Sequence, residues 1–258
     1  MLDPLLFEEG RLEAMKSFTG LHRPEGEDGI GTLGEKSVHR VLKYCCSPFS
    51  DGREVTVGGY VADVVGEQGI IEIQSARFDR LRDKLGAFLS CCPVTVVWPA
   101  ERERWICMVD PGTGELLSRR KSPVHQTVYG IFPELYRLRE YLPLPGLRFR
   151  VALLETEEYR YRRPQKGRRA VRCDRIPLRL LGQEALDSPE DYLRLLPEGL
   201  PELFGAREVS DGLGLDQSSC RIMLRVMEAA GAVCFAGKDG RRLLFRKARD
   251  GETVFSDH

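Results

Sequence analysis

The stretch YVADVVGEQGIIEIQSARFDRLRDKL, residues 60–85, determines the expected fold. Two short runs of branched apolar residues flank the turn sequence GEQG, which is typical of two antiparallel strands. The apolar residues that follow recur at helical spacing and predict a helix. Asp63, Glu72 and Gln74 interrupt the apolar runs, although a carboxylate is costly to bury without a partner. Their position inside an expected sheet points to a site.

The residues on either side extend this pattern. A β-branched run ahead of the stretch, ended by two glycines, predicts a strand that pairs antiparallel with the next one. Before it, apolar residues at helical spacing predict a helix. A continuous apolar run after residue 85 predicts a strand buried on both faces. In order, we expect a helix from Leu33, strands at 53–58, 59–66 and 70–74, a helix at 77–90 and a strand at 93–99.

The remainder of the chain divides by composition. A hairpin is expected around the turn DPGTG, with RWICMVD and ELLS as its strands, then a helix at 126–142 and a strand at 147–155. Residues 159–175, YRYRRPQKGRRAVRCDR, carry eight Lys or Arg against one acid, and PEGLP then reads as a linker. The predicted division is a first domain at 1–156, a basic connecting segment at 157–196 and a last domain at 197–258.

Composition bounds the cellular setting. The formal net charge is +0, so the balance of the whole chain implies no particular partner. None of the eight cysteines has the spacing of a zinc knuckle, and free thiols are typical of a reducing compartment. The first residues carry acids where a secretory signal has bases, and no run is long enough to cross a membrane. We therefore expect a cytoplasmic protein without a membrane partner, and a homodimer is compatible with the sequence.

The acidic side chains have a common chemistry. Glu72 and Gln74 lie two apart on one strand and project from the same face, and Asp63 belongs to the strand paired with it. Two facing carboxylates repel each other unless a proton or a cation lies between them. Hard oxygen ligands suit Mg²⁺ or Mn²⁺. Glu35, in the first turn of the preceding helix, is a candidate third oxygen ligand.

At residues 33–99 the chain resembles the PD-(D/E)XK nuclease superfamily. The likeness lies in the order helix, three strands, helix, strand, with Asp63 on the second strand, Glu72-x-Gln74 on the third, and GEKSVH as a first-helix glutamate motif. The resemblance implies an α/β fold with a restriction-endonuclease-like αβββαβ core, a mixed sheet flanked by helices. It also implies hydrolysis of phosphodiester bonds in nucleic acid, with Asp63, Glu72 and Glu35 holding Mg²⁺ or Mn²⁺.

Two departures from the superfamily pattern keep a second function open. Val61–Ala62 stands where a proline precedes the aspartate, and Gln74 stands in the position of the catalytic lysine. Glutamine can hold a water but supplies no charge, so a cation from the following helix is expected, either Lys84 or Arg77. The alternative is a catalytically inactive nuclease-fold protein that binds nucleic acid or acts in regulation. None of the four histidines is expected to be a catalyst.

Two further segments are predicted to contact nucleic acid. Arginine grips phosphate through two hydrogen bonds, and the basic segment interleaves arginines with tyrosines, although a solvated face would look the same. Residues 200–248 resemble a winged helix, which serves either nucleic-acid contact or protein packing. The predicted contacts are Arg160, Arg162, Arg163, Lys166, Arg168, Arg169 and Arg172 in the basic segment, Arg221 on the second helix of the tail, and Lys238, Arg241 and Arg242 on its wing.

Overall fold

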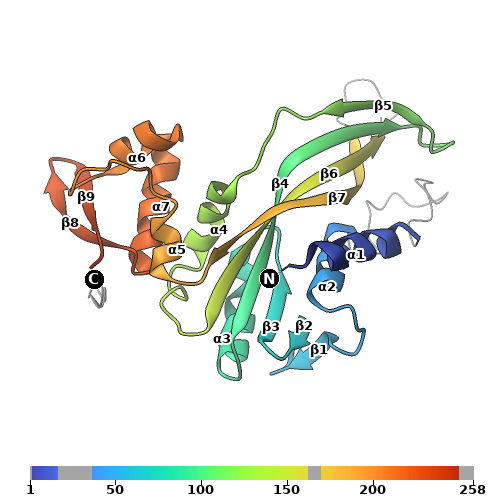
Figure 1. The fold of residues 1–258 in the computed structure, drawn as a ribbon, viewed down its shortest axis with the longest axis horizontal. Helices are drawn as coiled ribbons and strands as arrows, with labels where there is room; N and C mark the ends of the chain where they lie inside the picture. Colours follow the sequence, from blue (N-terminus) through green and yellow to red (C-terminus); the bar gives the residue numbers. More distant parts are fainter. Residues whose placement is uncertain (1, 17–36, 162–169, 250–258) are drawn as a thin grey trace.

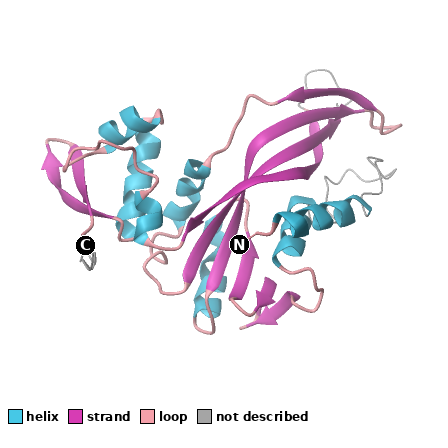
Figure 2. Cartoon of the chain, viewed as in Figure 1, coloured by secondary structure: helices cyan, strands magenta, loops and turns pink. Residues whose placement is uncertain are grey.

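The computed structural model describes residues 2–16, 37–161 and 170–249. Its centre is a seven-stranded mixed sheet in the order β1-β2-β3-β4-β6-β7, with β5 paired to β4 (Figure 1, Figure 2). The α/β fold class expected from the sequence is therefore confirmed. The strands of this sheet are β1 (Arg53–Val57), β2 (Tyr60–Gly66), β3 (Gly69–Ile73), β4 (Val94–Val109), β5 (Leu116–Lys121), β6 (Leu147–Tyr161) and β7 (Val171–Leu186).

Helices cover both faces of the sheet. On one face, apolar side chains of α1 and α2 pack with Ile73, Val97 and Leu154 in one core cluster. On the other face, Phe78 and Phe88 belong to a larger cluster that extends into the C-terminal helices. The helices are α1 (Pro4–Lys16), α2 (Ser37–Cys46), η1 (Phe78–Leu81), α3 (Arg82–Leu89), η2 (Val128–Ile131), α4 (Phe132–Arg137), α5 (Pro189–Leu193), α6 (Ala206–Leu213) and α7 (Gln217–Ala229).

The two turns that begin the sheet follow from glycine. Gly58 and Gly59 have φ of 56° and 84°, the left-handed conformation that a two-residue hairpin between twisted strands requires. β1 and β2 pair antiparallel on either side of them, as predicted. At the next turn Gly69 has φ of 106°, and β2 pairs antiparallel with β3 there. β3 then runs parallel to β4 after the crossover through η1 and α3.

β4 differs from the prediction of two separate strands at 93–99 and in RWICMVD. It is one strand that continues through a bulge between Glu101 and Glu103. Its first half pairs with β3 and its second half with β5. The polar run between the two apolar runs looked like a break, but Glu101 is buried and has partners, so the strand does not end there.

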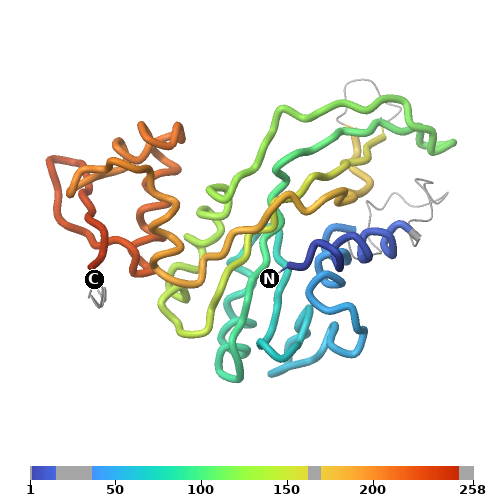
Figure 3. The backbone as a smooth tube through the Cα atoms, in the orientation of Figure 1, coloured from blue at the N-terminus to red at the C-terminus, as the bar shows by residue number. Residues whose placement is uncertain are grey.

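The structure also differs from the predicted connecting segment at 157–196. β6 continues to Tyr161, past the predicted boundary at residue 156, and β7 returns antiparallel beside it. Glu158 of β6 lies close to Arg160 and Arg172, two of the arginines that suggested an open linker. The N-terminal residues lie against β7, since Leu2 N–H donates to Gln183 Oε1 at 2.8 Å (Figure 3).

The C-terminal residues have the predicted order of helix, helix and two strands. Asp216 caps α7 by accepting a hydrogen bond from the Ser219 amide, as expected. β8 (Val233–Asp239) pairs antiparallel with β9 (Arg242–Lys247), and Phe204 adds one bridge to Phe245. α7 lies beside α4, so the core of this part is continuous with the core beneath the sheet (Figure 1). Among the described helices, none has the length and apolarity needed to span a membrane.

Gly69 gives a test of the β2–β3 connection. A Cβ at this residue would lie 2.1 Å from the backbone oxygen of Pro93, and the positive φ adds strain for any L side chain. We expect Gly69→Ala to lower the free energy of unfolding by about 2 kcal/mol or more. At Gly66 in the same hairpin, a Cβ would meet nothing within 4 Å. Urea unfolding should show little change for Gly66→Ala, and equal losses would contradict the structure.

Candidate functional site

Asp63 and Glu72 lie where β2 and β3 separate. The last backbone pair between these strands is Val64 with Ile71. Beyond it, side chains replace the backbone partners: Asp63 Oδ2 accepts from the Ile73 amide at 2.8 Å, and Glu72 Oε1 accepts from the Asp63 amide at 3.1 Å. The two predicted acids thus lie next to each other, and each one satisfies a backbone donor that the opening of the sheet exposes. They do not share one face of the sheet as predicted, because Asp63 turns to α2 on one face and Glu72 to α3 on the other.

Glu72 is almost fully buried and is held by α3. Its exposed fraction is 2%, and Lys84 Nζ donates to Glu72 Oε2 at 2.6 Å. Lys84 Nζ also lies 5.5 Å from the centre of the Phe88 ring, within reach of a cation–π contact. Burial raises the pKa of Glu72, the negative charge of Asp63 adds to the rise, and Lys84 opposes it.

Asp63 is held from the other helical layer, by α2. Its Oδ2 lies 3.1 Å from His39 Nε2, and its Oδ1 lies 3.2 Å from the buried Lys43 Nζ. Burial would raise the pKa of Asp63, but hydrogen bonds from His39 and the Ile73 amide, with the charges of His39 and Lys43, outweigh it. Together they lower the pKa to about 2. Asp63 is therefore a stable carboxylate at neutral pH.

The other predicted catalytic residues have different outcomes. Glu35 lies outside the described residues. Gln74 follows the end of β3, and its amide donates to the carbonyl of Ala76 at 2.6 Å, so its nitrogen is used locally. Of the two cations expected from the following helix, Lys84 reaches the acids, whereas Arg77 is more than half exposed and lies 3.8 Å from Asp79. Within the described ranges, no three His, Cys, Asp or Glu side chains gather as a metal-binding group.

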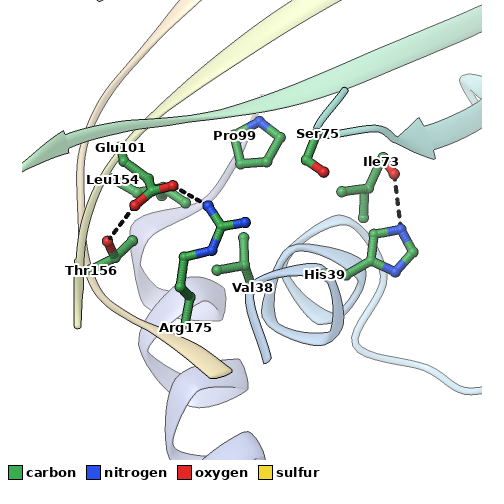
Figure 4. A pocket seen from close by; sticks show the side chains of 9 residues that line it. All are labelled: Val38, His39, Ile73, Ser75, Pro99, Glu101, Leu154, Thr156 and Arg175. Carbon is green, nitrogen blue, oxygen red and sulfur yellow. Dashed lines mark hydrogen bonds and ion pairs between the residues drawn. The ribbon is translucent and has the colours of Figure 1, made fainter. Parts of the chain in front are cut away.

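A cavity lies on the α2 face of the sheet, next to His39, which contacts Asp63 (Figure 4). Its volume is about 50 Å³, enough for a few water molecules. His39 lines it, and His39 Nε2 lies 2.9 Å from the Ile73 carbonyl oxygen. On the far side, the Glu101 carboxylate accepts from the Arg175 guanidinium and from Thr156 Oγ1 (Figure 4). The cavity is therefore apolar in its walls and polar at both ends.

The predicted nucleic-acid contacts are only partly described. Arg160 hydrogen bonds to Glu158, and Arg172 lies 3.7 Å from the same carboxylate. Arg242 on the wing is held by Glu208 at 2.7 Å. The side chains of Arg221, Lys238 and Arg241 are exposed. Arg162, Arg163, Lys166, Arg168 and Arg169 lie outside the described residues.

His39 and Lys43 are site residues that sequence reasoning missed. They lie four apart on α2, so both project toward Asp63 from one face of the helix. This spacing is visible in the sequence, but the apolar stripe at Val38, Val41 and Leu42 gave the stronger signal. Only the packing of α2 against β2 shows that the polar side chains beside the stripe meet the acid.

The geometry defines an α/β protein in which two neighbouring acids, each with its own cationic partner, occupy an opening between two strands. The chain belongs to the family described as "Domain of unknown function (DUF8091)", whose model matches residues 36–187. This range runs from α2 to the end of β7 and leaves out the C-terminal helices. An uncharacterized protein of Treponema pallidum (strain Nichols) is 30% identical over 229 residues, which cover 86% of this chain and 89% of that protein. No solved structure matches the chain.

The low pKa of Asp63 predicts a loss of stability in acid. Because its folded pKa, about 2, lies below the ordinary aspartate value of 3.8, Asp63 stabilises the native state above pH ~4, and this contribution disappears as the pH falls toward ~2. We expect Asp63→Asn to remove up to about 2 kcal/mol of that pH dependence, measured by urea unfolding across this range. Glu72→Gln should act in the opposite direction, since the pKa of Glu72 is raised. A slope unchanged by Asp63→Asn would contradict the assignment.

The contact between Lys84 and Glu72 predicts a dependence of one residue on the other. Lys84→Met leaves a buried carboxylate without its cation and should cost about 2 kcal/mol of stability. Adding Glu72→Gln to the same protein should restore most of the loss, because the buried charge is gone. Arg77→Met, at a neighbouring exposed cation, should change stability by less than about 0.5 kcal/mol. Urea unfolding of the wild type, Lys84→Met, Glu72→Gln and the double variant gives the coupling free energy.

Proposed function

We propose that this protein is a metal-dependent nuclease that hydrolyses phosphodiester bonds of nucleic acid. One observation carries the proposal: Lys84 of α3 donates to Glu72 at 2.6 Å, directly beside Asp63. This is the cation that the resemblance to the PD-(D/E)XK superfamily requires, supplied by the helix because glutamine stands at position 74. The order of helix, three strands, helix and strand around these residues supports the same reading.

The donor set at the opening suits a hard divalent ion. Asp63 and Glu72 offer carboxylate oxygens, and the Ile73 carbonyl oxygen and Asp63 Oδ2 each lie about 3 Å from His39 Nε2. Such oxygens suit Mg²⁺ or Mn²⁺. Asp63 and Glu72 would hold the ion, with Glu35 as the third predicted ligand. The bound ion would lower the pKa of a water and polarise the phosphodiester.

Lys84 would then contact the attacking water or the substrate next to the metal ion, and not the ion itself. Its ammonium group has three donors, and one of them binds Glu72. A second donor can orient the attacking water or a phosphate oxygen. Gln74, whose nitrogen is bound to Ala76, keeps its side-chain oxygen as an acceptor for that water. His39 and Lys43 keep Asp63 ionised, which a metal ligand requires.

The C-terminal part is proposed to be a winged helix that contributes to binding. The order of α6, α7 and the β8–β9 hairpin, with the bridge from Phe204 to Phe245, supports this resemblance. Exposed Arg221, Lys238 and Arg241 favour a role in contacting nucleic acid, whereas the packing of α7 on α4 favours a role in supporting the sheet. All eight cysteines are free thiols, which supports a reducing, cytoplasmic location.

A catalytically inactive protein that binds nucleic acid is the second candidate. The observation that favours it is that each acid already has a cation: Lys84 for Glu72, and Lys43 for Asp63. A metal ion must compete with these lysines. If no metal ion displaces the lysines, the two acids serve only to satisfy the backbone donors where the strands separate. The protein would then bind nucleic acid without hydrolysing it.

Cleavage assays test the proposed function. Wild-type protein should cleave labelled DNA or RNA when Mg²⁺ or Mn²⁺ is added. Asp63→Asn and Glu72→Gln should each lower the rate at least about 100-fold, because both remove a charged metal ligand. Lys84→Gln should lower kcat more than it raises KM. Asp187→Asn, at a carboxylate paired with Arg150 away from the site, should keep wild-type activity.

Metal titration separates the two candidates. A ligand that binds the native state raises its apparent stability, so Mn²⁺ should increase the melting temperature of the wild type. The increase should vanish in Glu72→Gln. If the wild type shows no cleavage and no Mn²⁺-dependent shift in melting temperature but still binds an oligonucleotide, the protein is the inactive binding protein and not a nuclease.

A further inference from the structure

Four arginines from three neighbouring strands gather around two buried glutamates on the α2 face of the sheet. Glu101 and Glu158 are 7% and 2% exposed. Glu101 binds one arginine of β7 and one of β4, and Glu158 is approached by arginines of β4, β6 and β7. We call these guanidinium groups the arginine row: Arg104 on β4, Arg160 on β6, and Arg172 and Arg175 on β7.

The arginine row carries more positive charge than its own acids offset. Four guanidinium groups face the two glutamates and Asp174, which accepts from Ser37 of α2, so the positive charges exceed the carboxylates by one. Arg172 is 49% exposed, and its nearest approach to Glu158 is 3.7 Å, longer than a hydrogen bond. Among the described residues, Arg104 Nε is the buried side-chain nitrogen for which no acceptor is found. The row therefore has unused donors as well as unused charge.

The opposite face of the same strands provides a contrast. Glu155 and Glu157 alternate with the cavity-facing residues of β6 and so project from the other side. There Glu155 binds Arg179, Glu157 binds Arg119, and the charges balance one to one. The positive excess thus belongs to one face and is not a general property of these arginine-rich strands.

The arginine row leads to the candidate site. Arg175 and Glu101 line one end of the cavity, and His39 lines the other (Figure 4). His39 in turn contacts Asp63 at 3.1 Å. An elongated anion that lies along the row would therefore have one end beside His39 and Asp63.

We propose that the arginine row binds the phosphodiester backbone of a nucleic-acid strand and directs it toward Asp63 and Glu72. This inference rests on the proposed function for its ligand. Guanidinium groups match phosphate oxygens through paired hydrogen bonds. The buried glutamates hold the side chains in place before the ligand arrives, so less rotamer freedom is lost on binding. The half-exposed Arg172 supplies donors for phosphate oxygens.

Binding measured without metal tests this proposal separately from catalysis. A fluorescein-labelled oligonucleotide, single-stranded or duplex, is titrated with protein in EDTA while anisotropy is followed. Arg172→Gln/Arg175→Gln should weaken binding at least about tenfold, and the slope of log Kd against log salt should fall by nearly two. The matched control, Arg119→Gln/Arg179→Gln, removes two arginines that pair with glutamates on the opposite face and should bind as the wild type does.

If the loss of Arg175 leaves the buried Glu101 short of positive charge and the double variant fails to fold, a single variant still tests the proposal. Arg172→Gln alone removes a half-exposed group and should weaken binding without changing the melting temperature. Equal weakening by the variants of both faces, or no salt-dependent binding by the wild type, overturns the arginine row as a nucleic-acid site. If the wild type binds the oligonucleotide but does not cleave it with Mg²⁺ or Mn²⁺, the nuclease proposal fails while the arginine row stands as a nucleic-acid site.

Discussion

The hydrogen bond from Lys84 to Glu72 is the constraint on which the rest of the structure depends. A carboxylate buried to this degree requires a cation, and the only one close enough comes from α3, within the part of the chain that the structure describes. The contact fixes α3 against the end of β3, where Phe88 and Leu85 complete the core beneath it. The same carboxylate closes the opening of the sheet by accepting from the Asp63 amide. The Glu72 side chain therefore serves both the packing of α3 on the sheet and the proposed chemistry.

The two acids are neighbours in opposite electrostatic environments. Asp63 receives donors and positive charge from α2, which lower its pKa, whereas burial raises the pKa of Glu72. Such a difference between adjacent carboxylates is typical of functional sites, although structural ion pairs produce it too. The two proposed functions differ in whether a divalent ion can displace the lysines that now balance these charges. That competition, more than the presence of the acids, decides between a nuclease and an inactive binding protein.

The extended strands show how buried acids give a sheet two different faces. Alternation places Glu158 with the cavity-facing residues and Glu155 and Glu157 on the other side. Three arginines approach Glu158, but one arginine approaches each of the others. The described arginines of the predicted basic run, Arg160, Arg172 and Arg175, thus lie on the face with excess positive charge. The pairs on the other face are balanced. The excess positive charge therefore lies on the same face of the sheet as the cavity.

The sequence by itself determined the elements from residue 53 to residue 99, because hydrophobic periodicity and paired glycines are local signals. It also identified Asp63, Glu72 and Lys84, since charges inside apolar runs and on helix flanks are visible without a structure. Only the tertiary structure decided that Lys84 rather than Arg77 reaches the acids, that α2 supplies His39 and Lys43, and that residues 171–186 join the sheet. The reason is that these outcomes depend on which side chains meet across layers, and a buried counter-charge can keep a polar segment in a strand where local composition predicts a linker.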